Sequence, residues 1–269
     1  MNETAHNGKI AVVTGAAGGM GAAVAARLAA ARWPLLLCDL EAGRLESIAA
    51  KFRAGGRSAE ILAGDIADPS YPARLTAALA GRDIGVFIHT AGLSPTMADA
   101  ERILRVNFDA TARLVEVARP RMAKSGCAVL IASSAAHMVK SDEIDLALTE
   151  AVATRSSAPL LPWAPRPEMA YPVSKRAVIR LVAHEATAFG ERGARIVSIS
   201  PGLIDTAMTR AEQTASEQIK LLLARTPLGR LGTADEIASV AIFLCSNDAS
   251  YVTGCDIRVD GGTLASLGL

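Results

Sequence analysis

The chain has 269 residues, 51% of them hydrophobic, and a net charge of +1 at pH 7. It is long enough for one large α/β domain, and its near-neutral balance gives no electrostatic reason to expect a nucleic acid or an anionic membrane as a partner. Without a signal-peptide pattern, an apolar run of membrane-spanning length or a cysteine–histidine metal spacing, we expect a cytoplasmic protein that holds no metal.

Short apolar runs alternate with helical patterns along the chain. We predict strands at residues 10–14, 35–39, 58–62, 84–89, 128–133, 195–199 and 256–259. Helices are expected near residues 21–31, 41–52, 69–79, 98–124, 172–190 and 233–246. Strands that are apolar on both faces and separated by helices are typical of a parallel sheet covered on both sides. The sequence predicts one α/β domain over residues 1–269, a Rossmann-type doubly wound fold with seven parallel strands and its ligands beyond their carboxyl ends.

A glycine-rich turn, TGAAGGMG, directly follows the first predicted strand. Gly15 allows a sharp turn, and Gly19 and Gly21 have no side chain to keep a pyrophosphate from the backbone. The following helix points its N-terminal N–H groups and positive dipole end at such an anion. Asp39, about twenty residues further on, closes the second strand and is placed to accept hydrogen bonds from a ribose diol.

The charge around Asp39 indicates which nucleotide binds. A 2′-phosphate needs a cation at this place, but the neighbouring Gly18 and Leu40 are not basic. Arg44 is the only nearby basic residue that favours NADP(H). The sequence therefore favours NAD(H) as the cofactor.

Residues 135–170 interrupt the alternation of strands and helices. They contain an acidic stretch capable of forming a helix, 141–153, followed by a proline-rich stretch around Trp163. A loop of this length inside a compact domain is usually functional or disordered.

Tyr171 and Lys175 are four residues apart, so on a helix they share one face. Pro172 suits a first helical turn, which would place Tyr171 at the start of the helix. A phenol has a pKa of about 10, and a nearby ammonium lowers it by favouring the phenolate. The pair could therefore act as an acid and base near neutral pH.

Further short motifs lie in a fixed order around this pair. They are Asp65-Ile66, Ala91-Gly92, Asn107, Ser133-Ser134, Pro201 to Thr206, Tyr251 to Gly254, and Val259 to Gly262. Together with the glycine turn and the Tyr171–Lys175 pair, they resemble the short-chain dehydrogenase/reductase family over nearly the whole chain.

The resemblance implies roles for four residues. Tyr171 corresponds to the general acid/base, and Lys175 to the residue that holds the nicotinamide ribose and lowers the pKa of the tyrosine. Ser134, rather than Ser133, corresponds to the residue that orients the substrate oxygen. Asn107 corresponds to the helix residue that helps to hold a water linking Lys175 to solvent.

The resemblance also implies the cofactor contacts, with Ile204 and Thr206 against the nicotinamide carboxamide. The expected cofactor-binding residues are Gly15, Gly18, Gly19, Met20, Gly21, Asp39, Leu40, Asp65, Ile66, Ala91, Gly92, Tyr171, Lys175, Pro201, Gly202, Ile204 and Thr206.

The chain departs from the family pattern in two places. His89-Thr90 stands where the family usually has two asparagines; His89 could sense pH or touch the cofactor, but a structural role is favoured. The spacing between Ser134 and Tyr171 is much longer than usual. Certain hydroxysteroid dehydrogenases in the family carry an insertion here. Since the resemblance places Ser134 and Tyr171 at the reacting centre, and residues 135–170 join them, we predict that this segment forms a wall or lid over the nicotinamide end of the cleft.

We therefore expect an NAD-dependent oxidoreductase acting on a secondary alcohol or ketone, and the sequence gives less support to two alternative functions. A catalytically silent NAD-binding redox sensor or scaffold need not keep Asn107, Ser134, Tyr171 and Lys175 together. A sugar-nucleotide epimerase or dehydratase usually has a different glycine spacing and a longer C-terminal substrate domain than the few residues after Gly262.

The substrate and the assembly are less readable. Two apolar regions suit a hydrophobic substrate, although they could equally pack against the body of the protein or a second subunit. The first, in the 135–170 segment, consists of Met138, Leu160, Leu161 and Trp163. The second, after Thr206, consists of Met208, Ile219, Leu221, Leu222 and Leu223. The resemblance implies a homo-oligomer built through the long helices and the C-terminal segment, with a tetramer slightly favoured over a dimer.

Overall fold

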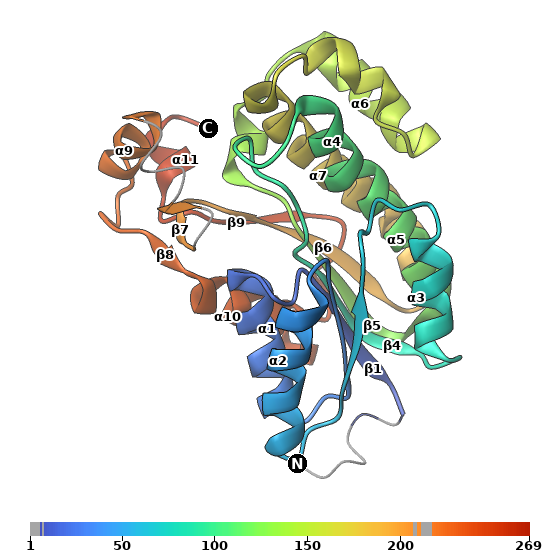
Figure 1. The fold of residues 1–269 in the computed structure, drawn as a ribbon. Coiled ribbons are helices and arrows are strands. Elements are labelled where there is room, and N and C mark those ends of the chain that lie inside the picture. Colours follow the sequence, from blue (N-terminus) through green and yellow to red (C-terminus); the bar gives the residue numbers. More distant parts are fainter. Residues whose placement is uncertain (1–5, 7, 207–208, 211–216) are drawn as a thin grey trace.

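Seven parallel strands form one central sheet in the computed structural model, which describes residues 6, 8–206, 209–210 and 217–269 (Figure 1). The strand order is β3-β2-β1-β4-β5-β6-β9, and every pairing is parallel. The bounds are β1 Ile10–Thr14, β2 Leu35–Asp39, β3 Ala59–Ala63, β4 Ile84–His89, β5 Met122–Ile131, β6 Arg195–Pro201 and β9 Asp256–Val259. The predicted doubly wound sheet is confirmed, and its order reverses between β1 and β4, where such folds bind ligands.

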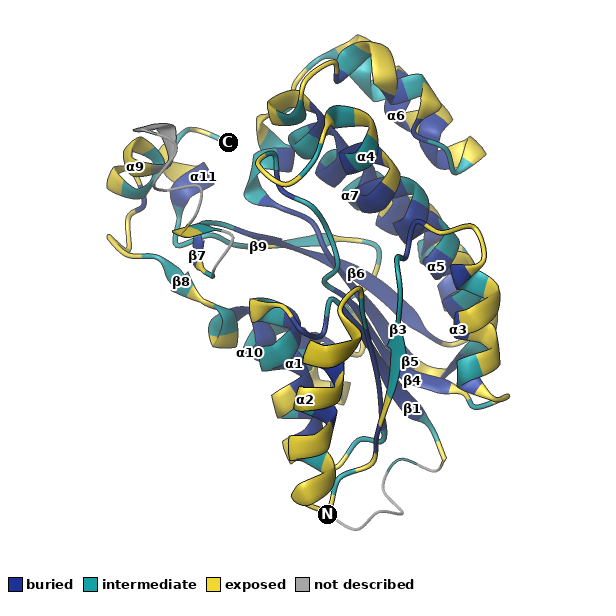
Figure 2. Ribbon diagram, viewed as in Figure 1, coloured by how far each residue is buried: buried dark blue, intermediate teal, exposed yellow. Residues whose placement is uncertain are grey.

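Helices cover both faces of the sheet, as Figure 1 shows. One face carries α1 (Gly19–Ala30), α2 (Ala42–Ala54) and α10 (Ala234–Leu244). The other carries α3 (Tyr71–Leu79), α4 (Ala100–Leu104), α5 (Thr111–Ala118) and α7 (Pro167–Gly190). Because the strands are buried on both sides, as the dark blue centre of Figure 2 shows, they read as continuous apolar runs in the sequence.

Smaller elements complete the fold near the C-terminus. The short strands β7 (Ile204–Asp205) and β8 (Gly232–Thr233) pair in a separate parallel sheet. Two further helices are α9 (Glu217–Ala224) and α11 (Thr263–Ser266), and short 3₁₀ turns lie at Arg119–Arg121 and Asn247–Ala249. None of the helices in the described part of the chain is both long and apolar enough to cross a membrane.

The predicted helix over residues 98–124 was wrong in its extent. Regular helix α4 gives way to a π-helical stretch, Arg105–Ala110, before α5 resumes, and β5 already begins at Met122. Pro120 explains the end of the helix, since proline cannot continue the backbone hydrogen-bond pattern. The π-helical stretch carries Asn107, and such bulges often occur at functional sites.

The start of α7 also differs from the prediction. The helix begins at Pro167, which takes the first-turn position that the sequence assigned to Pro172. Pro172 instead lies inside the helix, and Tyr171 lies in its second turn rather than at its start. Both prolines fit a first turn, so local preference alone could not choose between them.

The 135–170 segment folds into a 3₁₀ helix η4 (Ser134–Met138), helix α6 (Asp142–Thr154) and a second 3₁₀ helix η5 (Ala158–Trp163). Helix α6, expected from the acidic stretch, packs on α7. Leu148 and Val152 are buried on its inner face, whereas Leu146 is 74% exposed. Most of the segment is thus a docked layer rather than an irregular loop (Figure 1).

An ion pair cluster fixes this layer to α7. Glu185 on α7 is only 1% exposed, and its carboxylate accepts from Arg155 Nη2 at 2.7 Å and from Arg119 Nη1 at 2.9 Å. Asp109 accepts from the backbone N–H of Ser157 at 2.6 Å. A buried carboxylate is tolerated only when it is paired in this way, so the end of α6 is held firmly to α7.

Candidate active site

The glycine turn between β1 and α1 leaves no space for a side chain at Gly15 or Gly21. Gly15 has a φ of +69°, and a Cβ placed on Gly21 would lie 2.1 Å from the Gly15 carbonyl oxygen. A Cβ on Gly19 would lie 3.0 Å from Cγ2 of Thr206. The turn thus packs its backbone closely at the start of α1, and Thr206, which was expected at the nicotinamide carboxamide, lies beside Gly19.

Asp39 at the end of β2 is held by two backbone donors. Its Oδ2 accepts from the Ala17 N–H at 2.9 Å, and its Oδ1 accepts from the Leu40 N–H at 2.8 Å. Arg44 donates through Nη2 to the Ala17 carbonyl oxygen at 2.8 Å, and Leu40 is 63% exposed. A fixed carboxylate therefore stands beside the glycine turn, and one guanidinium binds the backbone carbonyl of the same residue, Ala17.

Asp65, after β3, contacts a residue that the sequence did not single out. Its Oδ2 accepts from Arg102 Nη2 at 2.5 Å, and its Oδ1 accepts from the Ala67 N–H at 2.9 Å. Ile66 is 7% exposed, so only its backbone is available to a ligand. Arg102 comes from α4, and no sequence pattern could pair it with Asp65 before the strand order was known.

Lys175 and Tyr171 lie on the inner side of α7. The Lys175 side chain is buried, its Nζ donates to the Ile131 carbonyl oxygen at 2.8 Å, and it lies 6.0 Å from the centroid of the Tyr171 ring. Burial disfavours the ammonium and lowers the pKa of Lys175 to about 8. The predicted pair is therefore brought together at the carboxyl end of β5.

Asn107 approaches Lys175 from the π-helical stretch. Its amide bonds both backbone groups of Leu93, accepting from N–H at 2.8 Å and donating to C=O at 3.0 Å, and also donates to Ser174 Oγ at 3.1 Å. A Cβ placed on Gly92 would lie 3.2 Å from both Asn107 Oδ1 and Lys175 Nζ. These residues therefore converge after β4, where Ala91-Gly92 was predicted to meet the cofactor.

The two serines after β5 have different surroundings. Ser133 caps η4, because its Oγ accepts from the Ala135 N–H at 3.2 Å. Ser134 is the first residue of η4, which packs against α7. Among the residues that the structure describes, the Ser134 hydroxyl has no hydrogen-bond partner, so it remains available to a substrate oxygen.

His89 has a structural environment rather than a ligand-facing one. It is 2% exposed, and its ring nitrogens contact Thr14 Oγ1 at 2.7 Å and Thr111 Oγ1 at 2.8 Å. Burial lowers the pKa of His89 to about 3, so the ring stays neutral across the physiological range. This geometry supports the structural interpretation favoured by the sequence and removes the pH-sensing one.

The 201–206 stretch runs from the end of β6 into β7. The Gly202 N–H donates to the Val259 carbonyl oxygen at 3.0 Å, and a Cβ on Gly202 would lie 2.7 Å from Cα of Asp260. Ile204 is 5% exposed and packs in the core, so its backbone rather than its side chain is available for a carboxamide. Pro201 is also buried.

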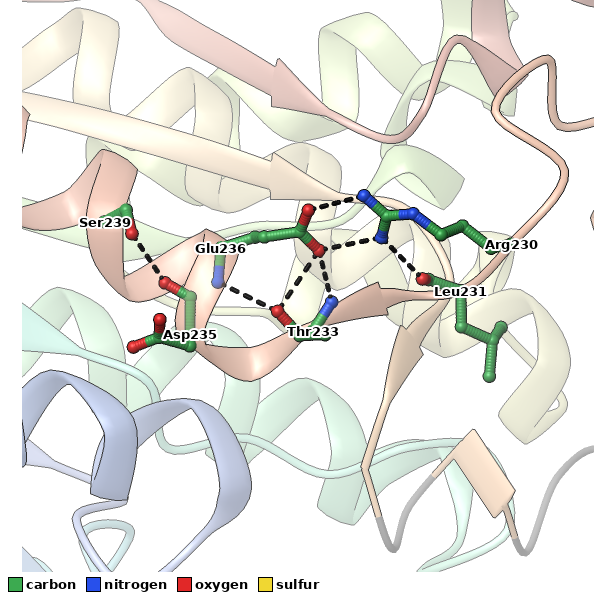
Figure 3. A network of polar contacts seen from close by, with 6 residues as sticks. All are labelled: Arg230, Leu231, Thr233, Asp235, Glu236 and Ser239. Carbon is green, nitrogen blue, oxygen red and sulfur yellow. Dashed lines mark hydrogen bonds and ion pairs between the residues drawn. The ribbon is translucent and has the colours of Figure 1, made fainter.

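A polar network holds β7 and β8 in place, as Figure 3 shows. Thr233 and Glu236 form a reciprocal capping box at the start of α10, and Arg230 donates to both carboxylate oxygens of Glu236, at 2.7 and 3.0 Å. The Arg230 guanidinium and the capping contacts lower the pKa of Glu236 to about 2. The pairing of β8 with β7 then fixes the position of Ile204. A side chain at Gly232 would displace Ile204, because a Cβ there would lie 2.7 Å from Ile204 Cδ1.

The apolar residues predicted near the substrate differ in how far they are buried. Leu160 is fully buried between α6 and the core, so it does not face a ligand. Met138 and Leu161 are 39% and 42% exposed, and Trp163 is half-buried against the same core cluster. Met208 and the side chain of Ile219 lie outside the described residues. The described part of the chain contains no cluster of potential metal ligands.

Comparison with known proteins identifies the family. Residues 9–143 match the family model described as short chain dehydrogenase, and residues 150–263 match the one described as enoyl-(acyl carrier protein) reductase. A short-chain dehydrogenase/reductase, bsc3, of Alternaria brassicicola is 32% identical over 266 residues, covering 93% of this chain and 94% of its own. The chain belongs to the short-chain dehydrogenase/reductase family of oxidoreductases, whose members bind a nicotinamide cofactor.

Two further relatives bear on function. The galactitol 2-dehydrogenase of Rhizobium johnstonii is 29% identical, covering 95% of both chains. A short-chain dehydrogenase of Burkholderia cenocepacia, solved in complex with NADP, is 26% identical with a TM-score of 0.76, covering 96% of this chain and 98% of its own. The chain thus shares its fold with a dehydrogenase that was solved with NADP, and nearly its whole length with a galactitol 2-dehydrogenase.

Proposed function

We propose that the protein transfers a hydride between NAD(H) and a secondary alcohol or ketone, with Tyr171 as the general acid/base. The observation that carries the proposal is the buried Lys175 ammonium beside the Tyr171 ring, at the point where Gly92, Asn107 and η4 meet. The glycine turn and the fixed carboxylate of Asp39 fit a dinucleotide. The bound nicotinamide would accept or supply the hydride.

The chain's own residues would handle the proton and the orientation. Tyr171 Oη accepts the hydroxyl proton during alcohol oxidation and returns it during ketone reduction. The positive charge of Lys175 favours the phenolate form. Ser134 donates to the substrate oxygen and holds it at Tyr171, while the Asn107 amide, fixed by Leu93, keeps a water route to Lys175 open.

The class of substrate can be determined by measuring the reduction of NAD⁺ with a panel of alcohols. Relatives include a dehydrogenase of a sugar alcohol, whose secondary hydroxyl is chemically equivalent to that of a steroid or terpenoid alcohol. We propose a hydrophobic substrate, because Met138 and Trp163 present apolar surface from the 135–170 segment. NAD⁺ reduction should be screened with steroids, terpenoid alcohols, hydroxyacyl thioesters and, as the polar comparison, polyols; turnover with none of them would count against the dehydrogenase proposal.

We expect NAD(H) to bind more tightly than NADP(H). A 2′-phosphate would face the Asp39 carboxylate, which two backbone N–H groups hold in place. Asp39→Ala with Leu40→Arg removes an anion and adds a phosphate partner, which should shift the ratio of dissociation constants by at least about tenfold, or about 1.4 kcal/mol. Isothermal titration calorimetry with both nucleotides checks this.

The control for this experiment is Arg44→Ala. In the described structure Arg44 is the cation that binds the Ala17 carbonyl oxygen, so its loss should weaken the binding of NADP(H) more than that of NAD(H). Tighter binding of NADP⁺ than NAD⁺ by the unmodified protein would overturn the assignment of Asp39. NADP-bound relatives make this comparison necessary.

We propose that the protein forms a homo-oligomer. Phe243 at the end of α10 and Tyr251 nearby in the chain are 50% and 102% exposed, which leaves large apolar surface near the C-terminal segment. The subunit contacts were expected on the long helices and on the C-terminal segment. Helix α6 covers part of α7, so the C-terminal segment is the more exposed of these two surfaces. Light scattering at micromolar concentration should give the mass of a tetramer or dimer; a single monomeric mass would contradict the proposal.

A further inference from the structure

A polar cluster lies under η4, on the face of the sheet that α7 covers. Ile196 packs in the core on the α7 side of β6, whereas Val197 and Ile199 pack on the opposite side. Side chains alternate along a strand, so Ser198 and Ser200 lie on the α7 side with Ile196. Both serines are fully buried, and β6 there pairs with β9.

His137 of η4 and Asp256 of β9 complete this cluster. His137 Nε2 lies 2.9 Å from Asp256 Oδ2 and 3.2 Å from Ser200 Oγ, and Ser198 Oγ donates to Asp256 Oδ1 at 2.6 Å. The two ionisable side chains are only 11% and 7% exposed. A carboxylate oxygen only accepts, so Nε2 carries a proton and donates to Asp256. Both oxygens of the carboxylate are thereby satisfied.

The cluster connects the sheet to the helix that carries Ser134. Among the described residues, no other side chain of η4 hydrogen-bonds to a strand. A buried carboxylate and imidazole are costly unless paired, so the pair favours one position of η4 against β6 and β9. His137 is three residues after Ser134, so one turn of 3₁₀ helix links the two.

We propose that His137 is a positioning residue, which acts through Asp256 and Ser200 to hold η4 so that the Ser134 hydroxyl faces the substrate oxygen. The proposal rests on the function proposed above for Ser134. His137 does not touch the reacting atoms. It fixes the segment in which the substrate-facing hydroxyl lies, and a shift of about 1 Å in such a group can cost up to about 10²-fold in rate.

Hydrogen exchange tests the anchor without requiring any substrate. In His137→Ala, the amides of residues 134–138 should exchange at least about tenfold faster than in the wild-type protein, because η4 opens locally. His137→Gln, whose amide N–H can reach toward Asp256, should restore most of the protection. His184→Ala is the matched control, since His184 is exposed on α7. Unchanged exchange in both His137→Ala and Asp256→Asn would overturn the proposal.

A double-mutant cycle tests whether the anchor acts through Ser134. His137→Ala should lower kcat/KM by about tenfold or more while the dissociation constant of NAD⁺ changes less than about twofold. The same substitution in a Ser134→Ala background should have little further effect. Fully additive losses would show that His137 does not act through Ser134 and would overturn the proposal. Absence of turnover in the wild-type protein would instead contradict the proposed function, and the exchange measurement would still decide the role of His137.

Discussion

Tyr171→Phe should reduce turnover by at least about 10²-fold, the usual contribution of a general acid/base. The substitution removes the transferable proton and leaves the ring that packs against the core. NAD⁺ affinity should change little, because the glycine turn and Asp39 lie on other elements. Steady-state kinetics with the best substrate of the panel, together with calorimetric titration of NAD⁺, measure both quantities.

Tyr251→Phe provides the matched control for this experiment. Tyr251 is fully exposed, so the same chemical change there should leave turnover unchanged. Wild-type turnover in Tyr171→Phe would contradict the assignment of the acid/base. If the turnover of both the wild-type protein and Tyr171→Phe were very small, the result would favour the alternative of a catalytically silent nucleotide-binding protein.

The pH profile gives a second measurement of the same pair. Burial lowers the pKa of Lys175 to about 8, so its positive charge is present below that pH and is lost above it. The support that Lys175 gives to the Tyr171 phenolate should therefore fade as the pH rises through about 8. In Lys175→Met the pH dependence of kcat/KM in this range should disappear.

Those parts of the molecule that depend on local sequence could be predicted. The strands read as apolar runs because both faces of the sheet are covered, and the glycine turn is readable because a Cβ on Gly21 would meet the Gly15 carbonyl oxygen. Tyr171 and Lys175 are close because they lie one turn apart on a single helix. Each of these features is encoded within a few neighbouring residues.

Contacts between distant elements could not be predicted. Arg102 with Asp65, and His137 with Asp256, join elements that become neighbours only when the strand order is known. The start of α7 was ambiguous, because Pro167 and Pro172 both suit a first turn. These two hydrogen-bonded pairs join distant parts of the chain, so they are visible only in the folded protein.

Replacing residues 139–166 with a short Gly/Ser linker should lower stability and abolish turnover. The change keeps Pro167 as the first residue of α7, but it removes Leu148 and Leu160, which are fully buried. Two buried leucines contribute about 3 to 6 kcal/mol, and Glu185 also loses the Arg155 guanidinium. Because α7 carries Tyr171 and Lys175, its loss of support should disturb the proposed catalytic pair. Thermal unfolding and kcat/KM measure the two effects, while NAD⁺ should still bind through β1, β2 and α1.

Point substitutions separate the proposed wall from this structural support. Met138→Ala and Trp163→Ala keep α6 in place, and we expect each to raise KM for a hydrophobic substrate by about tenfold, since a buried apolar contact of this size is worth about 1 to 3 kcal/mol. Leu146→Ala is the control, because Leu146 faces solvent on the outer side of α6 and should change neither KM nor stability. If both substitutions left KM unchanged, or the shortened protein kept full kcat/KM, the 135–170 segment would serve only to cover α7. A raised KM with unchanged NAD⁺ affinity would place the segment at the substrate rather than at the cofactor, because the glycine turn and Asp39, which we propose to bind the nucleotide, follow β1 and β2.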